Sequence, residues 1–258
     1  MSTLTRTRSL ARAEGLQFTR NRTIVGMAII MPLLFPLAMF FLYLRIDTPW
    51  MATASALEVF LAFALLFVQF YAVLSMATTR RDEKVLKRLR TGEATDREIL
   101  VSLCLPGAVL LLVMSIIFTV VLLATGAPLP VNPLPVVVAL VLGIVLSSAL
   151  ALLTSAFTSN AEAAQVTSMP VFLLVLGSMS AFRFLIEGPA AAVIDRTPFA
   201  LILDLAQQGW LGAFSPDSPV LSAGEVFAMS WQKMLLLTLW TMVAVWAANR
   251  YMRWDSHR

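Results

Sequence analysis

Six long apolar stretches, separated by short polar or charged segments, dominate the pattern of this sequence. A helix of roughly 20 apolar residues spans the roughly 30 Å hydrocarbon core of a bilayer. Backbone groups inside a bilayer must be satisfied within the spanning segment, so the stretches predict an all-α polytopic membrane protein with a single domain, residues 1–258. The alternating segments that mark a membrane β-barrel are absent. The expected spans are residues 24–44, 52–79, 99–124, 134–157, 164–186 and 226–248.

Two segments outside these spans carry helical patterns of their own. Residues 1–23 hold five arginines and a weak apolar face, which predicts a helix lying on the membrane surface, the alternative being a frayed basic tail. Residues 187–225 are only moderately apolar and contain four prolines. Within them, residues 198–214 predict a helix that is too short and too polar to span, and we expect it to be re-entrant or interfacial.

Composition agrees with this pattern and indicates its orientation. The chain is 59% apolar and 13% charged, whereas soluble domains are nearer half apolar and a quarter charged. Most of the 19 Lys and Arg residues fall in the N-terminal segment, the loop 80–98 and the C-terminal tail. The positive-inside rule therefore predicts that both termini and this loop face the cytoplasm of a cell-membrane protein. The same rule explains the pI near 9.7 without a nucleic-acid partner.

Several chemistries lack the residues that they need. Cys104 is the only cysteine and His257 the only histidine, which excludes an internal disulfide and a histidine-based metal site or metalloprotease within one chain. The sequence has three lysines and no G-x-x-x-x-G-K-[ST] motif, so no phosphate-binding loop for ATP is predicted. We therefore expect no cofactor in this chain and no enzymatic activity.

The segment 80–98, RRDEKVLKRLRTGEATDRE, is the one long charged run. On a helix over residues 82–91 the basic side chains cover most faces and the apolar ones form a narrow stripe. The residues of this stripe are Val85, Leu86 and Leu89. Two interpretations stay open on physical grounds. The helix lies on anionic lipid, or it docks on a protein, for which the acidic pair Asp82 and Glu83 argues.

Local sequence signals also predict where the helix of this loop ends and where the next helix begins. Thr91-Gly92 predicts the end of the helix, because Gly is common just after a helix C-terminus. Thr95 followed three residues later by Glu98 predicts a capping box, in which each side chain bonds to the other residue's backbone N–H. A helix that leads into the third span is therefore expected to begin directly after Thr95.

The charged run resembles the coupling segment of ABC type-2 exporter permeases, where a Glu and a following Leu-x-x-Leu-Arg pattern form the helix that docks on the ATPase subunit. The matching positions here are Glu83, Leu86, Leu89, Arg90 and Thr91. FTRNRTIVGMAIIMPLLFP is similar to the family's basic elbow and first span, TPFALILDLAQQGWLG to its external segment, and MRWD to the ending of many actinobacterial members. The sequence departs from the family at Lys84, where a Gly is common, and near Gly92-Glu93, where a Pro is often found.

The resemblance implies that the chain is the membrane subunit of an ATP-driven exporter. ATP and Mg²⁺ would bind to a separate nucleotide-binding ATPase subunit. Two copies of this chain, or one copy and a paralogue, would form the membrane unit. The docking residues implied are Asp82, Glu83, Val85, Leu86, Leu89 and Arg90.

Few charges lie where a cargo would pass, and three of them form the candidate substrate path: Glu58, Arg183 and Glu187. Glu58 lies about two turns into the second span, where it either faces protein and water or lies at the outer interface. Arg183 and Glu187 are four residues apart, which predicts a pair at the outer end of the fifth span. Lys233 is expected to snorkel toward the outer interface.

The expected cargo is a hydrophobic or amphipathic drug, antibiotic or lipid-like molecule. The 16 Phe and 13 Met residues suit an adaptable apolar path. A lipid-linked polysaccharide is the alternative cargo. An ion-coupled secondary transporter is the alternative class, but it would need ionisable residues at the membrane midplane, whereas the charges here lie near the membrane edges.

Overall fold

The computed structural model describes residues 3–20, 22–46, 48–91, 95–160, 162–213, 215, 218–252 and 254. Within these ranges every regular element is a helix and none is a strand, which confirms the predicted all-α polytopic fold. The helices are α1 (Thr3–Arg20), α2 (Arg22–Arg45), α3 (Pro49–Phe63), η1 (Ala64–Tyr71), α4 (Ala72–Asp82), α5 (Val85–Arg90), α6 (Asp96–Ala124), α7 (Pro133–Phe157), α8 (Ala164–Thr167), α9 (Met169–Gly177), α10 (Ser180–Arg183), α11 (Pro189–Ile194), α12 (Pro198–Leu211) and α13 (Ala223–Tyr251).

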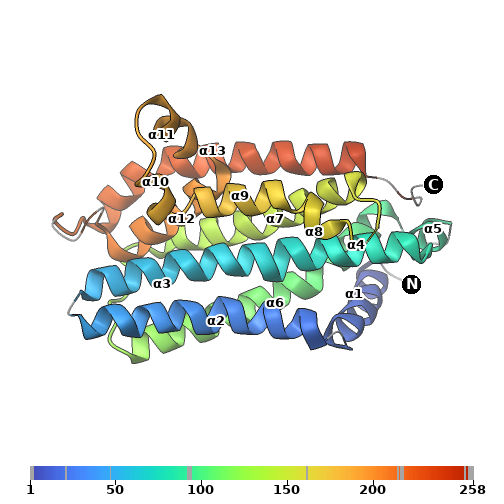
Figure 1. Cartoon of the computed structure of the whole chain (residues 1–258), viewed down its shortest axis with the longest axis horizontal. Coiled ribbons are helices and arrows are strands. Elements are labelled where there is room, and N and C mark those ends of the chain that lie inside the picture. Colours follow the sequence, from blue (N-terminus) through green and yellow to red (C-terminus); the bar gives the residue numbers. More distant parts are fainter. Residues whose placement is uncertain are drawn as a thin grey trace.

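The long helices form one elongated bundle. Among the described residues, four helical stretches are long and apolar enough to cross a membrane: Pro49–Asp82, Asp96–Ala124, Pro133–Phe157 and Ala223–Tyr251. Shorter apolar helices cover Ile29–Arg45 and Ala164–Gly177. Figure 1 shows α1, α5 and the last turn of α13 at one end of the bundle, and α10 and α11 at the other. The predicted N-terminal helix is therefore present as α1, which packs against α6.

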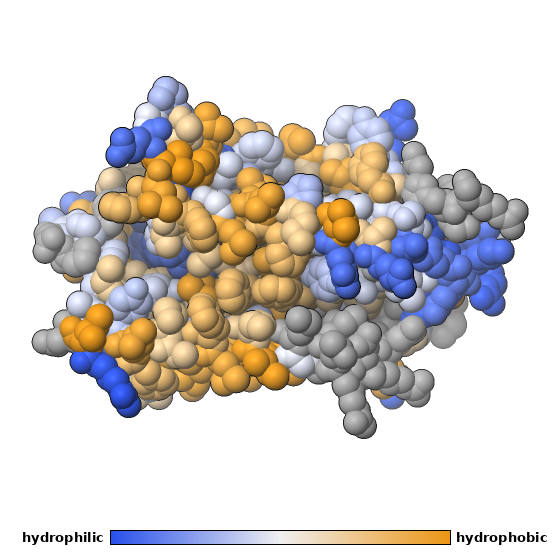
Figure 2. All heavy atoms as spheres, viewed as in Figure 1, coloured by the Kyte–Doolittle hydropathy of each residue, from blue (hydrophilic) through white to orange (hydrophobic). Residues whose placement is uncertain are grey.

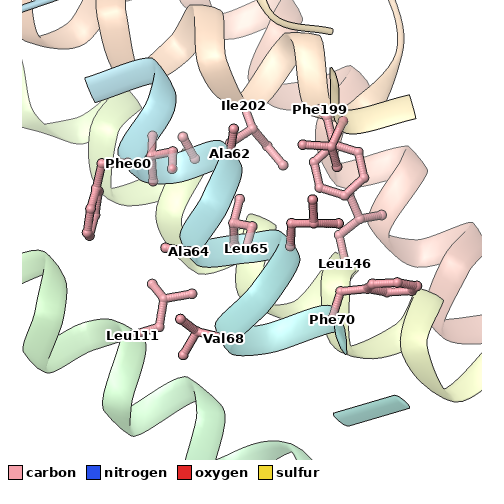
Figure 3. Close-up of a cluster of buried hydrophobic side chains, with 14 of the residues drawn as sticks. Phe60, Ala62, Ala64, Leu65, Val68, Phe70, Leu111, Leu146, Phe199 and Ile202 are labelled. Atoms are coloured by element: carbon pink, nitrogen blue, oxygen red, sulfur yellow. The ribbon is translucent and has the colours of Figure 1, made fainter. Parts of the chain in front are cut away.

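The centre of the bundle is the continuous helix formed by α3, η1 and α4. It has 34 residues, which corresponds to a length of about 50 Å, and most of its apolar window is buried by the neighbouring helices. Phe60 stacks on Phe118 of α6 with ring centroids 4.2 Å apart. Figure 3 shows Leu65 and Val68 of η1 lying near Leu146 of α7 and Leu111 of α6. The central helix thus reaches both ends of the molecule through one packed core.

The middle of this helix is η1, in which the hydrogen-bonding pattern is that of a π-helix. Its Gln69 is fully buried and donates through Nε2 to the Cys104 carbonyl at 3.1 Å and to Ser148 Oγ at 2.7 Å. A side chain at Gly107 would place its Cβ 2.8 Å from the Val68 carbonyl oxygen, so only glycine permits this approach of α6. Gln69 therefore joins three helices where the central one departs from α-helical geometry.

The external segment packs inside the bundle. Nearly all of α12 is buried, and it contacts α3, α7 and α13. The loop before α7 holds its end, because the N–H groups of Val131 and Asn132 donate to the carbonyls of Trp210 and Gly209 at 3.1 and 2.9 Å. α12 stops at Gly212, whose φ of 61° is unstrained in glycine. The helix predicted within residues 198–214 is present as α12 and is buried among the other helices of the bundle.

The predicted fifth span, residues 164–186, is not one continuous helix. It contains α8, α9 and α10, with breaks at Ser168 and at residues 178–179. At the second break the Ser180 N–H donates to the Glu58 carboxylate rather than to a preceding helical carbonyl. An apolar pattern alone does not distinguish a continuous helix from a buried chain whose backbone bonds to a distant side chain.

Candidate functional sites

A polar cavity of about 610 Å³ lies at the end of the bundle opposite α5. Its walls come from the end of α2, the start of α3, and α10, α12 and α13. Figure 2 shows hydrophilic residues recessed between α3 and α10 and surrounded by hydrophobic surface. The polar and charged residues of the lining include Ser55, Glu58, Ser180, Arg183, Asp195, Asp204, Gln207, Gln208 and Lys233. Charged groups inside an apolar bundle are costly unless they are paired or functional.

Asp204 on α12 is the centre of an ion-pair network in this cavity. One of its carboxylate oxygens accepts from Arg183 Nη2 at 2.6 Å, and the other accepts from Lys233 Nζ at 2.7 Å. Arg183 also donates through Nη1 to Asp195 at 3.1 Å. The network therefore connects α10, α12 and α13, and its opposite charges offset part of the cost of their own burial.

Glu58 lies in the same cavity wall but makes a different set of contacts. It is 4% exposed and accepts hydrogen bonds from the backbone N–H of Ser180 and, at 2.6 Å, from the Ser180 hydroxyl. Arg183 and Asp204 also act on it electrostatically, with opposite signs. Glu58 therefore faces protein and the polar cavity at this end of the bundle.

The structure does not support the predicted pair of Arg183 and Glu187. Arg183 is the last residue of α10, so the chain leaves the helix before Glu187 and the two residues do not lie one turn apart. Within the described part of the chain Arg183 pairs with Asp195 and Asp204, and Glu187 is exposed and lies outside the cavity lining. The structure thus brings Glu58 and Arg183 together and leaves Glu187 apart.

The ion pair between Asp204 and Lys233 in the cavity is not predicted from the sequence. No partner is predicted for Asp204 from the sequence, and Lys233 is expected to snorkel toward the outer interface. Each lies within an otherwise apolar helical stretch, and such a position is the signal that an ionisable residue has a partner or a function. The sequence did not show that the two residues meet, because they lie on different helices, α12 and α13.

The cavity contains both charged groups and polar atoms without partners among the described residues. Arg183, beyond the end of α9, is the first example. Burial alone would lower the pKa of its guanidinium, but the hydrogen bond and the charge of Asp204 outweigh burial and raise this pKa. Arg183 therefore stays cationic at any physiological pH. Within the described part of the chain, three buried atoms of the lining have no hydrogen-bond partner: Trp50 Nε1, Arg183 Nε and Gln208 Oε1.

The second candidate site is the turn and short helix at the opposite end of the bundle. The predicted helix over residues 82–91 is wrong in its extent, because α4 ends at Asp82 and α5 covers only Val85–Arg90. Between them Lys84 has a φ of 59°, in the left-handed region that L-residues rarely occupy. This geometry explains why a Gly suits the same place in the resembling segments, and it directs α5 away from the axis of α4.

Lys84→Gly should stabilise the protein. A non-glycine residue in the left-handed region costs roughly 1–2 kcal/mol, part of which is offset by the greater freedom of Gly in the unfolded chain, so we expect a gain of about 0.5–1 kcal/mol. Thermal unfolding of the purified protein in detergent measures this as an increase in Tm of about 2 °C. Lys87→Gly, inside α5, is the matched control and should lower Tm. A lower Tm for Lys84→Gly would contradict the assigned backbone.

The burial of α5 differs from the predicted docking stripe. Leu86 is 0% exposed and belongs to the core, and Leu89 packs against that core. Leu86 therefore holds α5 to the membrane domain and is not available to a partner. Among the described side chains of this turn and helix, those exposed are Asp82, Glu83, Lys84, Lys87 and Arg88; the side chain of Arg90, also predicted to dock, lies outside the described ones. Docking through this surface stays a prediction, and the surface available for it is charged.

Arg81 fastens the same region to the bundle. Its side chain is 1% exposed, and its guanidinium donates from Nη1 to the Ser155 carbonyl at 2.5 Å and from Nη2 to the Thr158 carbonyl. Both carbonyls belong to the C-terminal end of α7, where helical carbonyls lack intrahelical partners and the helix dipole favours a cation. In the sequence, nothing distinguishes Arg81 from the other basic residues of the charged run 80–98.

The start of α6 follows its sequence signal. Thr95 Oγ1 accepts from the Glu98 N–H at 3.3 Å, and the Glu98 carboxylate accepts from the Thr95 N–H at 2.8 Å. The predicted capping box is confirmed. A local motif therefore fixes the residue at which α6 begins, after the loop that follows α5.

Among models of known protein families, the one described as ABC-2 type transporter matches residues 5–185 of this chain. The chain belongs to the ABC-2 type transporter family. The match runs from α1 to just beyond α10, and so includes α5, Glu58 and Arg183, while Asp204 and Lys233 lie after it.

As an ABC-2 type transporter, the chain is a membrane transport component and not a catalytic domain. Its helical, apolar bundle is that of a multi-pass membrane protein. This membership does not support the ion-coupled secondary transporter considered from the sequence. A comparison with curated protein sequences gave no match.

Proposed function

We propose that the chain is the permease subunit of an ATP-driven exporter in the cell membrane, and that a separate ATPase subunit docks on the surface around α5. The observation that carries this proposal is the continuous helix Pro49–Asp82. Glu58 of the polar cavity lies near one end of it, and the exposed turn at Glu83 follows the other. One rigid element therefore joins the proposed docking surface to the cavity.

ATP and Mg²⁺ would bind to the ATPase subunit, with α5 and both termini in the cytoplasm. Closure of the ATPase subunits would displace α5, which Leu86 anchors to the core and Arg81 fastens to α7 through α4. The displacement would pass along the central helix toward Glu58, over about 35 Å from Arg81 at 1.5 Å per residue. Coupling of this kind needs a helix packing with two states, and both ATP binding at the ATPase subunit and cargo binding in the cavity must shift the equilibrium between them. The π-helical η1 is the part of this helix where its hydrogen bonding is irregular.

An aromatic strip supports a hydrophobic or amphipathic cargo and a second membrane subunit. Phe35, Phe63, Phe67 and Phe172 follow one another with ring centroids 5.6, 5.7 and 5.5 Å apart. All four rings are exposed or half-buried on the side of α2, η1 and α9. Aromatic rings provide large apolar contacts, so a second copy or a paralogue facing this strip would enclose a path for an apolar molecule.

The cavity supports a small cargo over a polymeric one. Its volume of about 610 Å³ falls in the range of roughly 300–1,000 Å³ typical of small-molecule sites. A drug, antibiotic or lipid-like amphipath would fit these dimensions. A lipid-linked polysaccharide stays the alternative cargo, and its export in reconstituted vesicles, without export of small amphipaths, would establish it.

The docking proposal is tested on the charged surface. We expect ATP hydrolysis sensitive to vanadate to co-elute with the tagged chain when it is purified from its native membranes in mild detergent. Combining Glu83→Ala with Arg88→Glu should reduce the co-eluting activity about tenfold, because interfacial charges select and orient partners. Glu162→Gln, at an exposed position outside both sites, should leave it unchanged.

Two results would overturn this proposal. The first is a correctly folded wild-type chain that elutes without any ATP-hydrolysing subunit. The second is full retention of the activity by the double variant, which would place the docking surface elsewhere on the chain.

A further inference from the structure

Glu58 stands apart from the other charges of the polar cavity. The lining includes the carboxylates of Glu58, Asp195 and Asp204 and the cations of Arg183 and Lys233. Asp204 takes both cations and Asp195 shares one of them, whereas Glu58 accepts only from Ser180 within the described part of the chain. The two cations are thus committed to other carboxylates, and Glu58 has no ion-pair partner of its own.

The surroundings of Glu58 supply further acceptor capacity. Gln208 lines the same cavity and is 8% exposed, and its Oε1 has no hydrogen-bond partner among the described residues. A buried amide oxygen without a partner carries a desolvation cost that a donor entering the cavity would relieve. Tyr43 and Trp50 also line the cavity, and aromatic rings of this type attract cations.

We propose that this cavity binds the ammonium group of an amphipathic amine, with Glu58 as its counter-charge and Gln208 Oε1 as a second acceptor. An ammonium group has three donors and no acceptor, which complements a carboxylate and an amide oxygen. The two unpartnered donors, Trp50 Nε1 and Arg183 Nε, suit an oxygen atom near the amine. The inference deepens the proposed function by naming the class of cargo, and it rests on that function only for the claim that the bound amine is exported.

A matched pair of fluorescent probes tests the site. Dansylcadaverine carries a primary ammonium group at the end of an apolar fluorophore, and its N-acetyl derivative is neutral with nearly the same shape. Binding of both is measured by fluorescence anisotropy to the full chain in phosphatidylcholine nanodiscs, without ATPase or nucleotide. Wild type should bind the amine on the order of ten- to hundredfold more tightly than the acetylated probe.

Glu58→Gln is the decisive variant, because it keeps the shape of the side chain and removes its charge. It should bind the two probes with equal affinity and leave the affinity for the acetylated probe unchanged, which also shows that the cavity is intact. Glu162→Gln removes an exposed carboxylate far from the cavity lining and should keep the preference for the amine. Equal binding of the two probes by wild type, or an unchanged preference in Glu58→Gln, would overturn the proposal.

The outcome is separable from that of the proposed function. If the amine preference holds but the chain brings no ATPase activity through purification, the exporter assignment fails and the binding site stands. If ATP-dependent export operates and the probes do not distinguish wild type from Glu58→Gln, the site fails and the exporter assignment stands.

Discussion

Arg81→Ala should destabilise the protein by about 3 kcal/mol and separate the α4 end of the central helix from α7. The substitution removes two charge-assisted hydrogen bonds and leaves the Ser155 and Thr158 carbonyls at the end of α7 without their guanidinium partner. An unsatisfied buried acceptor costs about 1–3 kcal/mol. Because Arg81 is 1% exposed, water does not replace it easily. Thermal unfolding in detergent should show a decrease in Tm of about 6–12 °C.

Two companion variants make this result specific. Arg81→Lys keeps the charge but lacks the planar fork that spans both carbonyls, so it should recover only part of the loss. Arg97→Ala changes an exposed arginine at the start of α6 and should leave Tm nearly unchanged. If Arg81→Ala unfolds at the wild-type temperature, the guanidinium does not hold α4 to α7.

Asp204→Ala should cost about 3–5 kcal/mol, because it removes the carboxylate that two cations of the cavity wall share, and leaves Lys233 without its ion-pair partner. Arg183 and Lys233 both bond to this carboxylate, and all three side chains are less than one-third exposed. Breaking a buried ion pair from one side leaves an uncompensated charge, which costs more than the pair itself contributes. The loss should loosen α10 and α13 from α12, since the network joins these three helices.

A double-mutant cycle measures this coupling directly. Lys233→Met removes one stranded cation, so Asp204→Ala combined with Lys233→Met should be more stable than the sum of the two single changes predicts. Asp195→Ala serves as the control, because Asp195 is 56% exposed and its pair with Arg183 should contribute at most about 1 kcal/mol. Strict additivity of Asp204→Ala and Lys233→Met would show that the contact of Asp204 with Lys233 carries no stability.

Features with local causes were predicted well from the sequence. The capping box at Thr95 and Glu98, the helix of the external segment and the long apolar helices follow from residues that are near neighbours in the chain. Errors arose where a distant residue takes over a backbone or side-chain bond. The helix of the predicted fifth span is interrupted where Ser180 bonds to Glu58, and Arg183 turns to Asp204 because α10 ends before Glu187.

The charged segment 80–98 shows the same difference between local and long-range causes within a few residues. Its charge and its narrow apolar stripe could be read directly, and so could the departure at Lys84 from the glycine that is common there. The left-handed turn at Lys84 and the inward direction of Leu86 required the structure. A stripe of apolar side chains has the same pattern whether it faces a partner or its own domain, and only burial distinguishes the two.

The sequence by itself therefore determined the membrane class, the helical architecture, the family resemblance and the position of the charged loop, because each depends on composition or on spacing within one helix. The tertiary structure decided which charges meet. Glu58 and Ser180 are 122 residues apart, Arg183 and Asp204 are 21, and Lys233 reaches Asp204 across 29. Such contacts depend on how separate helices pack against one another, and no local pattern in the chain records that packing.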